Sequence, residues 1–192
     1  DGAFTQNGAG AVQTAGDITT TNDTISFLRA VTLTDGGLIT LSTGAGIGNI
    51  NFQSTLNATT DFIEDLTLTA GTGSITFTGI VGGINDLGEV IVISALDVTA
   101  AAAFNANTLL QQAGTGDTQF DGAVALAAAG GLQLTTNTVT INSTINTLAG
   151  GNGGIVTITN AGLLDIAPAG DMSLDGAFTQ NGAGAVQTAG DI

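Results

Sequence analysis

The segment DGAFTQNGAGAVQTAGDI occurs twice in this 192-residue chain, at residues 1–18 and again, without a single change, at residues 175–192. The two copies begin 174 residues apart, at Asp1 and Asp175. Identity at all 18 positions indicates a recent tandem duplication, so we expect residues 1–174 to form one repeat unit and residues 175–192 to begin the next. A chain built from tandem units is expected to stack each unit on its neighbour.

A shorter and looser repeat lies within the unit. Stretches such as GNINFQSTL (48–56) and GSITFTGIV (73–81) alternate apolar residues with Thr, Ser, Asn or Gln, and related stretches recur along the chain. Alternation with a period of two gives each strand one buried and one wet face. A recurrence of roughly 19 to 28 residues, holding two or three strands and glycine turns, fits one coil of a β-solenoid. We predict an all-β parallel β-helix of about eight coils per unit, with seven to nine as the range, rising ~4.8 Å per coil.

The inward apolar residues of stacked coils form continuous ladders. Phe27, Phe52 and Phe77 are spaced by 25 residues, and Phe120 occupies the related stretch AGTGDTQFDGAV, so these four phenylalanines are the predicted core ladder. Glycine pairs at 36/37, 82/83, 130/131 and 153/154 are predicted at corners that need a positive φ. The alternative is that these glycines form the hairpin turns of a β-sandwich.

The charged residues are almost all acidic: the chain has 16 Asp and Glu residues, and only Arg29 is basic, which gives a formal net charge of −15. The chain has no His, Lys or Cys and so lacks an imidazole base, a Schiff-base amine and a thiolate; we therefore expect no enzymatic activity. Asp61, Glu64 and Asp65 form the densest carboxylate group, for which the alternatives are a hydrolase site and solvated turns. A single cation cannot neutralise phosphates, so binding to nucleic acid or to a membrane is not expected.

Calcium is the one metal that the composition favours, because it takes oxygen ligands from Asp, Asn and backbone carbonyls in glycine-rich turns. Two groups are candidates, namely Asn85, Asp86 and Glu89 in the stretch NDLGE, and the pair Asp171 and Asp175 near the unit junction. No complete calcium-roll motif accompanies them. Diffuse screening by counterions is the alternative interpretation.

Three asparagines satisfy the pattern for N-glycosylation, namely Asn22, Asn57 and Asn142. In a chain this rich in Asn and Thr such matches also arise by chance. Threonine pairs spaced by two resemble the ranks of ice-binding solenoids, but they fall in different strand classes, so an ice-binding face is not predicted.

The phrases LTLTAGTGSITFTGIVGG, GGLQLTT and GAFTQNGAGAVQTAGDI resemble the strand repeats of very large bacterial surface proteins related to filamentous haemagglutinin. The resemblance covers essentially the whole chain and is one of composition and strand pattern. It implies a right-handed parallel β-helix, secretion to the cell surface, and service as an adhesin, fibre or coat. It implies no catalytic residue.

These patterns together predict a structural role, as the repeat unit of a long extracellular fibre, sheath or adhesin stalk whose units stack end to end. The expected partner is then the chain itself, and no cofactor is expected apart from calcium. The alternative is an adhesin module that binds glycans or another surface, although Trp and Tyr, the usual platforms for sugars, do not occur in the sequence. Any secretory signal is expected to lie outside this segment.

Overall fold

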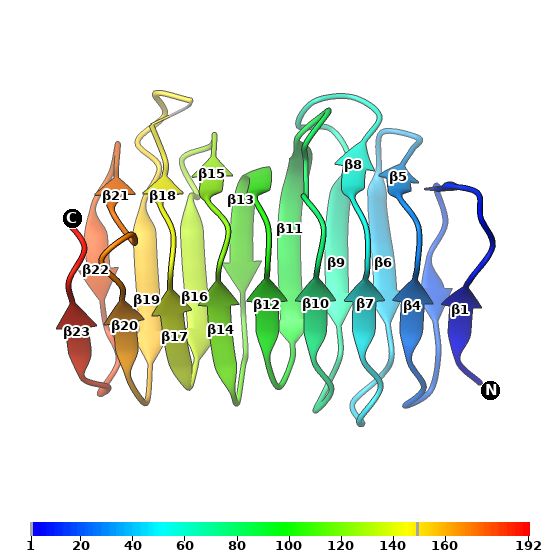
Figure 1. The fold of residues 1–192 in the computed structure, drawn as a ribbon, viewed down its shortest axis with the longest axis horizontal. Helices are drawn as coiled ribbons and strands as arrows, with labels where there is room; N and C mark the ends of the chain where they lie inside the picture. The colour runs from blue at the N-terminus through cyan, green and yellow to red at the C-terminus, as the bar shows by residue number, and fades with distance from the viewer. Residues whose placement is uncertain (1, 149) are drawn as a thin grey trace.

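The chain winds into a three-sided solenoid whose long axis runs horizontally in Figure 1. The computed structural model describes residues 2–148 and 150–192. All the regular secondary structure in these ranges is β-strand. Within each coil the chain passes along a front face, then an upper face, then a rear face, which we name by their places in Figure 1.

The front face is a nine-stranded sheet. Its strands in order are β1 (Phe4–Gln6), β4 (Ile25–Phe27), β7 (Ile50–Phe52), β10 (Ile75–Phe77), β12 (Val98–Ala100), β14 (Asp117–Phe120), β17 (Thr138–Ile141), β20 (Leu164–Ile166) and β23 (Val186–Thr188). Nine stacked strands on one face delimit eight complete turns.

The upper face consists of shorter strands, and isolated bridges through Val81 complete its column. Its strands are β2 (Val12–Thr14), β5 (Val31–Leu33), β8 (Leu56–Ala58), β15 (Val124–Leu126), β18 (Ile145–Asn146) and β21 (Met172–Ser173).

The rear face holds the longest strands. They are β3 (Ile18–Thr19), β6 (Leu38–Ser42), β9 (Asp65–Thr69), β11 (Leu87–Ser94), β13 (Phe104–Gln111), β16 (Leu132–Thr136), β19 (Val156–Asn160) and β22 (Phe178–Gln180). Strand β13 turns the corner between two faces, since Phe104 pairs with β15 on the upper face and Leu109 pairs with β16 on the rear face.

All the strand pairs described are parallel, and each joins one coil to the next. On the front face Ile25 pairs with Ile50, and Ile50 pairs with Ile75, so like residues lie over one another. These side chains point inward and are fully buried, whereas the residues between them point outward. The prediction of an all-β parallel β-helix with about eight coils is confirmed, and the sandwich alternative is wrong because its hairpin strands would be antiparallel.

Phenylalanine rings form a file along the core. Phe27, Phe52 and Phe77 stack with ring centroids 5.3 Å apart and interplanar angles of 9° and 5°. The next residue of this column is Ala100, followed by Phe120, which is buried but separated from Phe77 by that alanine.

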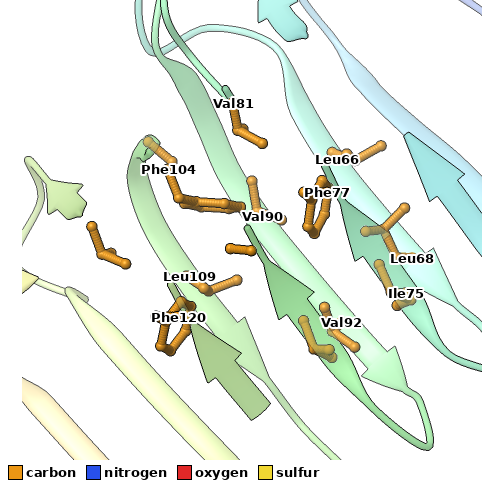
Figure 2. Packing of buried hydrophobic residues seen from close by; sticks show 14 of the residues in the cluster. Leu66, Leu68, Ile75, Phe77, Val81, Val90, Val92, Phe104, Leu109 and Phe120 are labelled. Carbon is orange, nitrogen blue, oxygen red and sulfur yellow. The ribbon is translucent and has the colours of Figure 1, made fainter. Parts of the chain in front are cut away.

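A fifth buried phenylalanine enters the core beside Ala100. Phe104 comes from the upper face and meets Phe77 edge to face, with a centroid distance of 5.5 Å (Figure 2). The small side chain of Ala100 and the ring of Phe104 thus share the space that a fourth stacked ring would take. The sequence pattern did not single out Phe104, because its neighbours on the upper face are Val81 and Val124.

One glycine of each predicted corner pair has a positive φ. The values are 63° for Gly36, 66° for Gly82, 52° for Gly131 and 73° for Gly153. At Gly131 a Cβ would also lie 2.0 Å from the carbonyl oxygen of Ile155 in the next coil. That corner needs glycine both for its backbone conformation and for the close approach of two coils.

Replacing Phe52 by alanine should lower the free energy of unfolding by about 3 to 5 kcal/mol, because the ring is buried between two stacked neighbours and its loss leaves a cavity. Phe62→Ala is the matched control, since Phe62 is 37% exposed and its truncation should cost less than about 1 kcal/mol. Denaturant unfolding followed by circular dichroism measures both. Equal costs for the two variants would contradict the ladder.

Gly131→Ala should lower stability by more than the roughly 1 to 2 kcal/mol that a left-handed conformation costs, because the contact with Ile155 adds to it. Gly37→Ala provides the control, as its Cβ would meet no atom within 4 Å and its φ is not positive. Thermal melts of the two variants test the corner, and a Gly131 variant as stable as the Gly37 variant would refute it.

Candidate functional site

The carboxylates of the corners accept hydrogen bonds from backbone N–H groups of a neighbouring coil. Asp65 Oδ1 accepts from the N–H of Glu89 at 2.6 Å, and Asp97 Oδ1 accepts from the N–H of Asp117 at 2.9 Å. The same bond recurs between Asp17 and Thr40, Asp61 and Asp86, and Asp171 and Asp191. These aspartates therefore act as side-chain acceptors for backbone N–H groups of the next coil, which lie in strands at Thr40, Glu89 and Asp117.

Asn85, Asp86 and Glu89 lie along one turn and the strand that follows it, and the Asn85 amide and the backbone N–H groups of Asp86 and Glu89 donate to the preceding coil. The Asn85 side-chain amide donates to the carbonyl of Thr59 at 2.7 Å, and the Asp86 N–H donates to Asp61. Glu89 points into solvent. Within residues 2–148 and 150–192, no group of three or more acidic side chains is gathered closely enough to hold a metal ion. Calcium binding here stays a prediction.

The second calcium candidate is a pair of carboxylates with separate backbone partners. Asp171 accepts from the N–H of Asp191 at 2.9 Å, whereas Asp175 Oδ2 accepts from the N–H of Gly153 at 2.6 Å. The Asp175 N–H in turn donates to the Thr147 hydroxyl at 3.1 Å. Each carboxylate therefore has a structural task that is independent of any metal.

Asp61, Glu64 and Asp65, the candidates for a hydrolase site, accept hydrogen bonds from three different N–H groups. Glu64 is only 2% exposed, and its Oε2 accepts from the N–H of Thr60 at 3.1 Å, which closes the turn before β9. Asp61 is exposed and Asp65 is half-buried. No pocket opens on the surface of the described residues beside them. Each of these carboxylates thus has a hydrogen-bonding role in the fold, and the expected lack of enzymatic activity stays a prediction.

The turn that contains Asp86 concentrates negative charge. Partial burial, and then repulsion from the nearby carboxylate of Asp61, raise the pKa of Asp86 above its ordinary value of 3.8. The aspartate is held beside Asp61 because its own N–H donates to that carboxylate at 2.9 Å. The hydrogen bond thus brings two like charges together.

The three glycosylation candidates differ in accessibility. Asn22 is exposed in a turn with a φ of 62°, and Asn142 is half-buried with its side-chain amide donating to Asp121 at 2.8 Å. Asn57 is only 6% exposed, and its Oδ1 accepts from the N–H of Ile84 at 2.9 Å. In the folded chain Asn57 is thus the least accessible of the three, and glycosylation stays a prediction.

Comparison with protein-family models, curated proteins and solved structures found no match to this chain. Among the residues described, no helix has the length and apolarity needed to cross a membrane. The role of this chain is accordingly inferred from the geometry of the solenoid. Two features of that geometry bear on a role, namely the aspartate hydrogen bonds between coils and the unpaired strands at the two ends of the sheets.

Asp86→Asn should change the pH dependence of stability. Because the native pKa is raised, the folded chain binds more protons than the unfolded chain above pH 3.8, and wild-type stability falls as pH rises through the native pKa. Asparagine removes this loss, so the variant should gain stability relative to wild type at pH 7 but not at pH 3.

Asp35→Asn, an isosteric change in an exposed turn, controls for the loss of one negative charge. Carbon-13 NMR of the Asp86 carboxyl reports the titration directly. A midpoint at or below pH 3.8 would show that the raised pKa is absent.

Proposed function

We propose that this chain is a structural unit of a long extracellular filament, in which units stack end to end through the open edges of the solenoid. The observation that carries the proposal is that identical 18-residue segments form the two opposite ends of the stack. A parallel β-solenoid exposes unpaired N–H and C=O groups only at its ends, and such edges pair readily with another strand. A repeat that supplies the same strands at both ends is suited to continuous growth.

The side chains at the two ends support this role. Phe4, Val12 and Ile18 at one end, and Leu174 and Phe178 at the other, pack on the core but are only partly buried. Val186, in the last strand of the front face, is 47% exposed although its column partner Leu164 is fully buried. One further coil at each end would bury these residues as their equivalents are buried within the stack.

The charge favours separate rods over lateral clumps. Residues 1–174 carry a formal net charge of −13, because Asp175 and Asp191 belong to the next unit, and this charge repeats along the axis with every unit. Neighbouring rods therefore repel one another at low ionic strength. Divalent cations would reduce this repulsion and bring rods together. Stiffness follows from the hydrogen bonding between coils, and the near absence of Lys and Arg leaves few sites for trypsin-like proteases.

The resemblance to surface proteins related to filamentous haemagglutinin points in the same direction, and on that basis we place the filament outside a bacterial cell. A glycan-binding adhesin module has less support. Sugar sites usually offer an exposed aromatic ring, and five phenylalanines of this chain, Phe27, Phe52, Phe77, Phe104 and Phe120, lie fully in the core. The outward columns of Thr, Asn and Gln provide hydrogen-bonding groups without such a platform.

A chain made of residues 1–174 followed by residues 1–192 tests the proposal. It should be a single rod longer than the 192-residue chain by about 35 to 40 Å, since each coil adds ~4.8 Å. Small-angle scattering and electron microscopy measure the length and the cross-section. Two globules joined by a flexible link, or a rod of unchanged length and doubled width, would contradict end-to-end stacking.

A further inference from the structure

The two identical segments lie on different faces of the solenoid. In the first copy the residues FTQ form β1 on the front face, where they pair with Ile25–Phe27 of β4. In the second copy the same residues form β22 on the rear face, where they pair with Val156–Ile158 of β19. Figure 1 shows β1 at the front of one end and β22 behind β20 and β23 at the other.

The residues VQT shift in the same direction. They form β2 on the upper face in the first copy and pair there with β5, whereas in the second copy they form β23 on the front face and pair with β20. Both strands of the segment are therefore displaced by one face between the copies. A repeat of 174 residues therefore advances the chain by eight coils less one face, that is, by seven complete coils and two of the three faces.

The eight-residue spacing between the two strands of the segment fits both placements. The step from rear to front takes eight residues between Val156 and Leu164, and it takes eight again between Phe178 and Val186. The step from front to upper face takes six residues in most coils, for example from Ile50 to Leu56, and eight residues from Leu164 to Met172. In the first copy that step takes eight residues, from Phe4 to Val12, and the extra length forms an exposed turn.

In a tandem array one 18-residue segment must do both tasks at once. The segment pairs with the preceding coil as residues 175–192 do here, and it pairs with the following coil as residues 1–18 do. Both sets of pairs hold together only if the next unit is turned by one face. We infer that successive units are joined with a rotation of one third of a turn, so that the front face of each unit continues the rear face of the unit before it.

This joint sets the surface of the filament. Three units, or 23 coils, are needed before a face returns to its place, which at ~4.8 Å per coil gives a surface repeat of about 110 Å. The projecting turns that carry Ile63 and Ile84, together with Asp61 and Asp86, would appear on each of the three sides in turn. Charge and protruding apolar residues are thereby distributed around the rod.

The inference rests on the proposed function, because it describes how stacked units meet. Its test uses the two-unit chain defined above and nitroxide labels, which the natural chain accepts cleanly because it has no cysteine. One doubly labelled variant carries Asp165→Cys in the first unit and Thr32→Cys in the second. Asp165 pairs with Gln187, and its equivalent Gln13 pairs with Thr32, so the labelled residues should lie two coils apart on one face, about 10 Å.

The matched variant carries Ser173→Cys in the first unit with the same Thr32→Cys in the second. Both are upper-face positions, and they would lie two coils apart if the units continued without rotation. Electron paramagnetic resonance should show strong dipolar broadening for the Asp165 variant and a clearly longer distance for the Ser173 variant.

Strong dipolar broadening in the Ser173 variant with a longer distance in the Asp165 variant would overturn the rotation. If the rod still has the expected length, the proposed end-to-end stacking is unaffected. Long distances in both variants, together with a rod that fails to lengthen, would overturn the proposed function as well. In the 192-residue chain, a variant with labels at Asp165 and Gln187 should show the one-coil distance, which checks the position of β23 independently of any joint. A long distance there would also overturn the inference.

Discussion

In-register pairing between successive coils is the interaction on which the rest of the structure depends. Strand β7 illustrates it: the N–H of Ile50 donates to the carbonyl of Ser74 at 3.0 Å, while the Phe52 carbonyl accepts from the N–H of Thr78 at 2.8 Å. Because each residue lies over its counterpart one coil away, apolar side chains form ladders and polar side chains meet polar ones. The phenylalanine file and the corner carboxylates both follow from this register.

Some of the acidic side chains have structural roles that follow from the same register. Asp97 links three consecutive coils, since Oδ2 accepts from the Ser74 hydroxyl at 3.3 Å and Oδ1 accepts from the N–H of Asp117 at 2.9 Å. Buried polar side chains are also paired, as where the Thr118 hydroxyl donates to Gln111 Oε1 at 2.7 Å. Of the buried side-chain nitrogen and oxygen atoms described, only Thr108 Oγ1 and Gln111 Nε2 have no hydrogen-bond partner. Carboxylates that first suggested calcium or hydrolysis are thus mainly acceptors for the backbone.

The open ends are the one place where the register is incomplete. A repeat that advances by eight coils less one face can still join its neighbour without a break, because the joint needs only matching strands and not matching faces. The strands of the duplicated segment that form the joint, β1 and β2 in the first copy and β22 and β23 in the second, are three residues long on every face, which makes this tolerance physically reasonable. The rotation would give the rod the same character on all sides, which a straight continuation would not.

The sequence by itself determined the strands, their inward and outward residues, and the number of coils, because these depend on period-two alternation and on repeats that are local. The equal spacing of Phe27, Phe52 and Phe77 likewise predicted their ladder. Only the tertiary structure decided that Phe104 fills the space beside Ala100, that Asn57 is buried, and on which face each copy of the duplicated segment lies. The reason is that a residue's face depends on the summed lengths of all preceding corners. Those lengths vary from coil to coil, and identical segments can therefore have different neighbours.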